Sequence, residues 1–143
     1  LQKMFRRLKE EFQAIKPDLT LKFQDEPAKI FTDTELLHQV FVAIISNSIK
    51  FIKEKPVIEI SCTQTKEHTL IEISDNGPGF EEKVLPHVFE RFYRGDSSHN
   101  RAAGGSGLGL SIAQAVVKSL NGKLTAENGK NGGAVLKITL KNS

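Results

Sequence analysis

The stretch TLIEISDNGPGF, residues 69–80, places an acid, an amide and two glycines directly after a strand-like segment. Its first six residues are rich in β-branched side chains, which favour a strand. Gly77 and Gly79 allow backbone conformations that other residues avoid, and they let the chain approach a ligand closely. Asp75 can accept a hydrogen bond from an exocyclic amine such as that of adenine. Taken alone, the stretch is equally compatible with a β-turn capped by an Asp.

The composition indicates one compact domain. The chain has 143 residues, of which 38% are hydrophobic and 26% charged, as in soluble globular proteins. The net charge of +3 is small and the basic residues are scattered, so nucleic acid is not an expected partner. The single cysteine, Cys62, excludes an internal disulfide, and its apolar surroundings predict a buried thiol. No apolar stretch approaches the roughly 20 residues of a membrane helix.

The periodicity of apolar residues predicts three helices and a mixed sheet. Helices are expected over residues 1–16, from a cap at Thr32 or Asp33 to about residue 49, and over residues 108–120. The expected strands are 19–23, 57–63, 69–74, 123–127 and 134–140, with a possible short strand at 29–31. The last two strands are expected to form a terminal hairpin around NGKNGG, residues 128–133. Residues 75–106 are expected to form a long loop with a short helical piece near 81–92. This order predicts an α/β two-layer sandwich, as a single domain over residues 1–143.

Asn47 and Lys50 are candidate ligand-binding residues on the second predicted helix. Asn47 lies in the stretch ISNSIKF, on an otherwise apolar part of that helix. A buried amide needs a partner, which could simply be a neighbouring loop. Its oxygen is also a hard ligand that suits Mg²⁺. Lys50 follows three residues later and therefore shares its face. An amide, an ammonium and a hard cation on one helical face suit a polyphosphate.

A second glycine-rich stretch, GGSGLGL at residues 104–110, precedes the third predicted helix. Glycines before a helix N-terminus leave backbone N–H groups free to bind an anion. The stretch fits neither the Walker pattern, because no Lys-Ser or Lys-Thr follows, nor a Rossmann site. Arg94, in VFERFYRGD at residues 88–96, suits bidentate phosphate contacts, although a solvated surface arginine is the ordinary alternative.

The motifs SNSIKF, DNGPGF, VFERFYRGD and GGSGLGL occur together in this order. In combination they resemble the catalytic and ATP-binding domain of a bacterial sensor histidine kinase. That domain has the Bergerat fold, shared with gyrase-type, chaperone and mismatch-repair ATPases. The resemblance covers about residues 1–140. It implies an enzyme of two-component signalling that binds Mg²⁺ and ATP and transfers the γ-phosphate to a histidine on a separate phosphoacceptor domain. A response regulator would be the next recipient.

The resemblance also implies roles for individual residues. Asn47 matches the asparagine that binds Mg²⁺, Lys50 the lysine that reaches the phosphates, and Phe51 the aromatic residue beside adenine. Asp75 matches the aspartate that bonds the adenine amino group, with Gly77 and Gly79 in the same motif. Arg94 matches the arginine near the γ-phosphate. The ATP lid would span residues 93–104. The second glycine-rich stretch at the nucleotide would comprise Gly105, Ser106, Gly107, Leu108 and Gly109.

Ala43 departs from the family pattern. Four residues before the metal asparagine, kinases usually have Asn and the hydrolysing ATPases have Glu, whereas this chain has Ala43. Without Glu the obvious base for activating water is missing, so gyrase-like hydrolysis is not expected. Without Asn, affinity for Mg²⁺ and ATP or phosphoryl transfer is expected to be weaker.

No histidine of the chain has the context of a phosphoacceptor. His38, His68, His87 and His99 are all expected to be surface residues. The acceptor is therefore expected on a helical-hairpin domain outside this chain. The chain opens on Leu1, which suggests an excised domain. The resemblance implies a homodimeric parent anchored in the bacterial cell membrane, with this domain in the cytoplasm.

Three alternative interpretations remain open at this point. Ala43 is compatible with a degenerate nucleotide-binding module that regulates or scaffolds a partner. A serine kinase of the anti-sigma type shares the same fold, although the N-terminal helix and VFERFYRGD fit sensor kinases better. An α/β domain with accidental glycines is the third.

Overall fold

The computed structural model describes residues 2–24, 32–52, 55–90, 109–130 and 132–141. Three α-helices, one short 3₁₀ helix and five strands are described. In chain order they are α1 (Gln2–Ile15), β1 (Thr20–Gln24), α2 (Thr34–Phe51), β2 (Val57–Gln64), β3 (His68–Asp75), η1 (Leu85–His87), α3 (Gly109–Ser119), β4 (Gly122–Asn128) and β5 (Ala134–Lys141).

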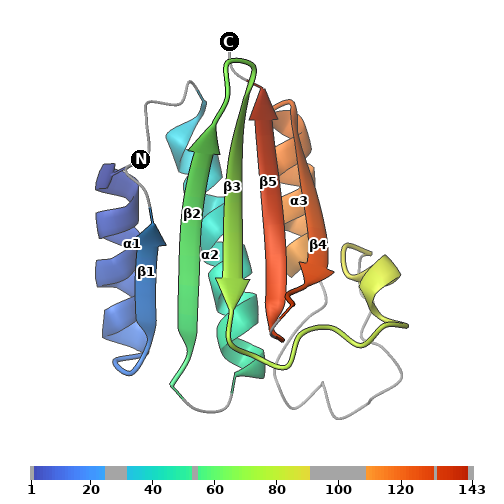
Figure 1. The fold of residues 1–143 in the computed structure, drawn as a ribbon. Helices are drawn as coiled ribbons and strands as arrows, with labels where there is room; N and C mark the ends of the chain where they lie inside the picture. Colours follow the sequence, from blue (N-terminus) through green and yellow to red (C-terminus); the bar gives the residue numbers. More distant parts are fainter. Residues whose placement is uncertain (1, 25–31, 53–54, 91–108, 131, 142–143) are drawn as a thin grey trace.

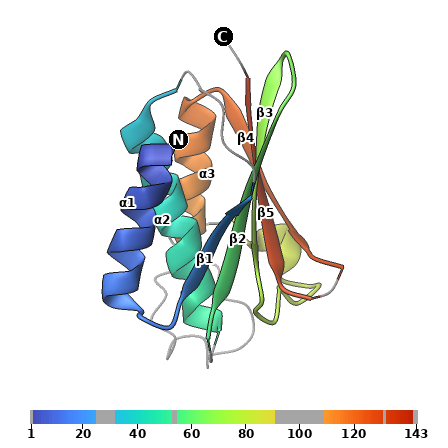
Figure 2. The same ribbon diagram turned by 60° about the vertical axis from the view of Figure 1, so that its left-hand side comes forward.

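The strands form one mixed sheet, in the order β1-β2-β3-β5-β4. The β1–β2 pair is parallel, whereas the other three pairs are antiparallel. The three described α-helices cover one face of this sheet, as Figure 2 shows. The predicted α/β two-layer sandwich with a mixed sheet is therefore confirmed.

The core lies between the helices and the sheet. Alternate residues of the strands point toward the helices, as the period of two requires. Ile60 of β2 faces Ile73 of β3, which in turn faces Leu136 of β5. Phe41 of α2 is fully buried and contacts Phe5 of α1 edge to face, with 5.6 Å between ring centroids. Cys62 is buried, as predicted.

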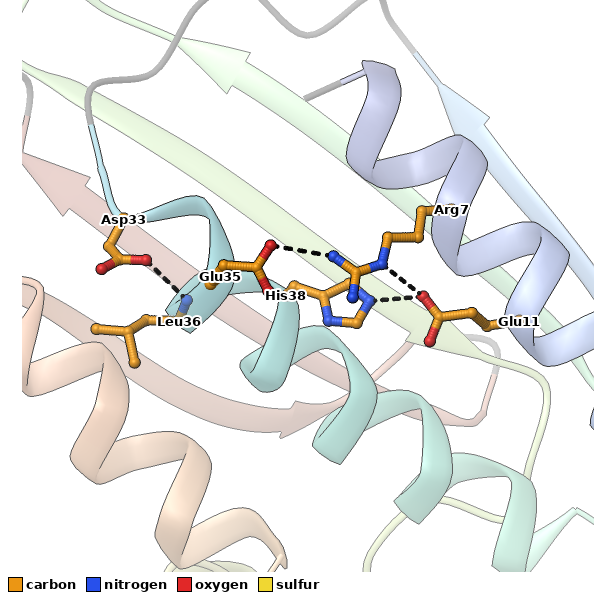
Figure 3. Close-up of polar contacts among 6 residues, drawn as sticks. All are labelled: Arg7, Glu11, Asp33, Glu35, Leu36 and His38. Carbon is orange, nitrogen blue, oxygen red and sulfur yellow. Dashed lines mark hydrogen bonds and ion pairs between the residues drawn. The ribbon is translucent and has the colours of Figure 1, made fainter.

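Polar contacts join the outer sides of α1 and α2 (Figure 3). Nε2 of His38 lies 2.9 Å from Oε1 of Glu11, and Arg7 bridges Glu11 and Glu35 with N–O distances of 3.1 Å. Asp33 caps α2 by accepting a hydrogen bond from the N–H of Leu36 at 3.1 Å. The prediction that His38 is a surface residue is wrong. Its side chain is only 9% exposed, because α1 packs beside α2 and covers it.

The opposite face of the sheet is polar. Lys137 of β5 lies 2.5 Å from Glu127 of β4 and 3.7 Å from Glu72 of β3. The hydrogen bond to Glu127 and the charge of that carboxylate raise the pKa of Lys137 above its ordinary 10.5. This cross-strand triad is solvated, so it orders the surface of the sheet rather than forming a core.

Most of the expected elements are confirmed, with shifts of a few residues at their ends. A helical piece was expected near residues 81–92. In its described part, residues 81–90, the structure has turns and the short 3₁₀ helix η1 in place of an α-helix. Pro86 lies inside η1 and provides no backbone N–H for a longer helix. The possible strand at 29–31 lies outside the described residues.

Candidate functional site

The described candidate residues of α2 and of the turn after β3 lie together at the end of the sheet where β3 finishes. The C-terminal end of α2, the end of β3 and the start of β5 lie together at the lower edge in Figure 1. Asn47 is half-buried on the last turns of α2, and the side chains of Lys50 and Phe51 are exposed at its end. Ile52 directly follows α2, and its Cγ1 lies 2.9 Å from the position of a Cβ built on Gly77. The end of α2 therefore packs against the turn that follows β3.

Asp75 is the most tightly positioned of the candidate side chains. Its Oδ1 accepts hydrogen bonds from the N–H of Gly77 at 2.9 Å and from the N–H of Ala134 at 3.0 Å. Its Oδ2 makes no hydrogen bond to any residue that the structure describes. Two bonds to one carboxylate oxygen fix the plane of the group and hold Oδ2 as an acceptor. Such a fixed acceptor can select a ligand that carries an N–H donor.

Gly133, the residue directly before β5, permits this arrangement of Asp75. It is buried and has a φ of 82°, in the region that favours glycine. A Cβ at this position would collide with the carbonyl oxygen of Asp75. From the sequence, Gly133 and Ala134 are expected only as parts of a hairpin, with no role in a site. The doubled glycine in NGKNGG is the one signal that could have indicated a close backbone contact.

Asparagine side chains hold both sides of the turn from Asp75 to Phe80. Asn76 accepts a hydrogen bond from the N–H of Val57 at 2.9 Å and donates to the carbonyl of Lys55 at 3.2 Å. On the other side, Asn128 bonds both backbone groups of Phe80. Gly79 lies between these attachments with a φ of 76°. The turn is therefore held by β2 on one side and by β4 on the other.

Asn47, Lys50 and Phe51 have side chains available to a ligand. Asn47 and Lys50 make no side-chain hydrogen bond or ion pair to any other described residue. Phe51, the last residue of α2, is 41% exposed, so its ring is open to a ligand. Ala43 lies one turn before Asn47 and is half-buried against the core, where it offers no polar group. The amide oxygen of Asn47 is a hard donor that fits Mg²⁺, which typically takes few protein ligands.

Several candidate residues lie outside the part of the chain that the structure describes. They are Arg94, Gly105, Ser106, Gly107, Leu108, the expected lid at residues 93–104, and His99. Gly109 is described and begins α3. A Cβ at Gly109 would meet no described atom within 4 Å, so packing among the described residues does not require glycine there.

The remaining histidines lie away from this edge or are paired. His68 is exposed at the start of β3, as predicted for a surface residue, and His87 is paired with Glu90. Among the described residues, no three His, Cys, Asp or Glu side chains are grouped in a way that could hold a metal ion. In the same part of the chain, no helix is both long and apolar enough to cross a lipid bilayer.

Comparison with known proteins shows the family of this chain. The sequence profile described as "Histidine kinase-, DNA gyrase B-, and HSP90-like ATPase" matches residues 32–143. The chain belongs to this ATPase family. Among curated proteins, it is 35% identical to the signal transduction histidine-protein kinase BaeS of Escherichia coli, over 78% of this chain and 24% of that protein. It is 33% identical to the heme sensor protein HssS of Staphylococcus saprophyticus, over 92% of this chain and 28% of that protein.

A solved structure supports the same fold. The mycobacterial sensor histidine kinase MprB superposes with a TM-score of 0.82 at 24% identity, over 99% of this chain and 93% of that one. The chain thus has the fold of histidine kinase ATP-binding domains and spans about a quarter of the length of the curated sensor kinases that it matches. The resemblance inferred from the four motifs is confirmed.

Proposed function

We propose that this domain binds ATP with Mg²⁺ and donates the γ-phosphate to a histidine on a separate phosphoacceptor hairpin of a sensor histidine kinase. The observation that carries the proposal is the geometry of Asp75. Two backbone N–H groups hold its Oδ1, so Oδ2 is a fixed acceptor for the amino group of adenine. Membership of the ATPase family and the names of the related sensor kinases support it.

The proposed site divides between base and phosphates. Asp75, Gly77, Gly79 and Phe51 would bind adenine, with the exposed ring of Phe51 beside the base. Asn47 would hold Mg²⁺, which when bound would neutralise charge on the phosphates. Lys50, on the same face of α2 as Asn47, would reach the phosphates as a second positive charge. Arg94 and the stretch Gly105, Ser106, Gly107, Leu108 and Gly109 would complete the phosphate side.

The transfer step needs mainly positioning and charge stabilisation by this domain. Ala43 supplies no base, so the acceptor domain would have to provide the general base as well as the nucleophilic nitrogen of its histidine. We expect that acceptor on a homodimeric, membrane-anchored parent with this domain on the cytoplasmic side, and a response regulator as the next partner. The expected lid at residues 93–104 and a single domain over residues 1–143 belong to the same proposal.

Labelling with γ-radiolabelled ATP tests the transfer. The chain alone should keep no label. A phosphoacceptor hairpin added together with Mg²⁺ should become labelled, and this label should be lost in acid, because phosphohistidine is acid-labile. The Asn47→Ala variant should lose this transfer. Label retained on a histidine of this chain would contradict the proposal. Acid-stable label on a serine of a partner would favour a serine kinase of the anti-sigma type.

Ala43 favours a second candidate function, a nucleotide-binding regulatory module without transfer. In the Ala43→Asn variant the missing amide is restored one turn before Asn47. If this variant binds Mg²⁺ and ATP more strongly and labels the hairpin faster, the unaltered chain is a kinase whose activity Ala43 reduces. Unchanged binding with no labelling of the hairpin would favour the regulatory module.

A further inference from the structure

Asn128, the last residue of β4, makes an unusual pair of hydrogen bonds. Its Oδ1 accepts from the N–H of Phe80 at 2.7 Å, and its Nδ2 donates to the carbonyl of Phe80 at 2.9 Å. The two residues are 48 positions apart in the sequence. The side-chain amide thus pairs with one residue as a neighbouring strand would. Figure 1 shows the end of β4 beside the segment that leaves the turn after β3.

The same side chain also fills the space beside Gly79 that a side chain would need. Oδ1 of Asn128 lies 2.7 Å from the position that a Cβ on Gly79 would occupy. Gly79 has a φ of 76°, and glycine restricts its own backbone least of all residues. The conformation of this residue therefore depends on what holds its neighbours. Asn128 holds Phe80, the residue directly after Gly79. Asn76 holds the other end of the turn, next to Asp75.

We propose that Asn128 is a positioning residue for the nucleotide site: by binding both backbone groups of Phe80, it fixes the Gly79 turn against the end of β4. The role rests on the proposed binding of ATP. The main-chain atoms of Gly79 contact the nucleotide in that proposal, and Asn128 acts through them without touching the ligand. Without it, the turn samples conformations that must be restricted again on binding, which weakens affinity.

Two variants separate this role from simple packing. Asn128→Ala removes both hydrogen bonds. Asn128→Asp keeps the size and shape of the side chain but replaces the donor to the Phe80 carbonyl with an acceptor. Thr125→Ala, at an exposed position of the same strand, is the matched control. Each chain is examined by thermal unfolding, by amide hydrogen exchange of Phe80, and by calorimetric titration with a non-hydrolysable ATP analogue.

The expected result is about tenfold weaker binding in both Asn128 variants and faster exchange of the Phe80 amide in Asn128→Ala, which loses the acceptor for that N–H. Folding should be retained and the control unchanged. Unchanged exchange at Phe80 would show that the pair does not restrain the turn. Faster exchange with unaltered affinity would overturn the positioning role alone. Absence of binding in the unaltered chain would overturn the proposed function, and this role with it. In that case, the exchange data would still show whether Asn128 restrains Phe80.

Discussion

Replacing Asp75 by asparagine should invert the base preference of the proposed site. The N–H groups of Gly77 and Ala134 both donate to Oδ1. In the Asp75→Asn variant these donors keep the amide oxygen on their side, because a flipped amide would oppose donors to donors. The amide NH₂ then occupies the place of Oδ2. An acceptor that matches the amino group of adenine becomes a donor that opposes it.

The expected loss of ATP affinity is large. A hydrogen bond to a charged group contributes about 1.5–3 kcal/mol, and an unpaired buried donor costs about 1–3 kcal/mol more. The sum corresponds to at least about 50-fold weaker binding, at about 1.4 kcal/mol per factor of ten. The two bonds to Oδ1 become neutral, so the free energy of unfolding should fall by about 1–2 kcal/mol. The variant should therefore remain folded.

Calorimetric titration with non-hydrolysable ATP and ITP analogues measures this inversion. Hypoxanthine carries an oxygen where adenine carries its amino group, so the NH₂ of the variant can donate to it. We expect the ratio of ATP to ITP affinity to fall by about 100-fold or more, because the variant loses a hydrogen bond to ATP and gains one to ITP. Urea unfolding should show an intact fold. A folded variant with the same ratio as the unaltered chain would refute the assignment of Asp75 to the base.

Three further predictions concern the stability of the fold. Gly133→Ala should lower the free energy of unfolding in urea by about 3 kcal/mol and weaken ATP binding, because the left-handed φ and the carbonyl of Asp75 both exclude a Cβ. Glu11→Ala should lower the free energy of unfolding, measured by thermal unfolding, by about 1 kcal/mol, because the buried His38 loses its partner. The raised pKa of Lys137 should stabilise the fold below pH 10.5, and this contribution should vanish as pH rises through the raised pKa.

Each of these predictions has its own control. Glu10→Ala changes an exposed neighbour of Glu11 and should leave the unfolding temperature unaltered. If both glutamate variants behaved alike, the pair with His38 would contribute nothing. For Lys137, the control is a Lys137→Met variant. The difference in free energy of unfolding between the unaltered chain and this variant should shrink as the pH rises above 10.5. A difference that stays constant with pH would contradict the prediction. Full stability of Gly133→Ala would show that the hairpin can shift away from Asp75.

The sequence predicted the elements well where their pattern is local. Apolar residues at helical spacing place α1 and α2, and Asp33 caps α2 as one of the two expected candidates. The role of the candidate Asp75 was inferred from its type and its place after a strand. What fixes its orientation could not be read from the sequence, because Ala134 lies 59 positions away. Only the pairing of β3 with β5 brings these residues together.

The same physical reason explains the other differences. His38 was expected at the surface because its own helix face does not reveal that Glu11 of α1 covers it. Asn128 and Gly133 were assigned to a hairpin turn because their local sequence is typical of one. Their contacts to Phe80 and Asp75 depend on the sheet order, which composition and periodicity do not specify. Long-range contacts of this kind set the geometry of the site.

The central claim is that this chain binds ATP with Mg²⁺ at the edge formed by α2, β3 and β5. The most direct test is calorimetric titration of the unaltered chain with a non-hydrolysable ATP analogue, with and without Mg²⁺. We predict saturable binding at one site that Mg²⁺ strengthens, and loss of this strengthening in the Asn47→Ala variant. Absence of binding under either condition would contradict the account, and the domain would then be a scaffold within its parent.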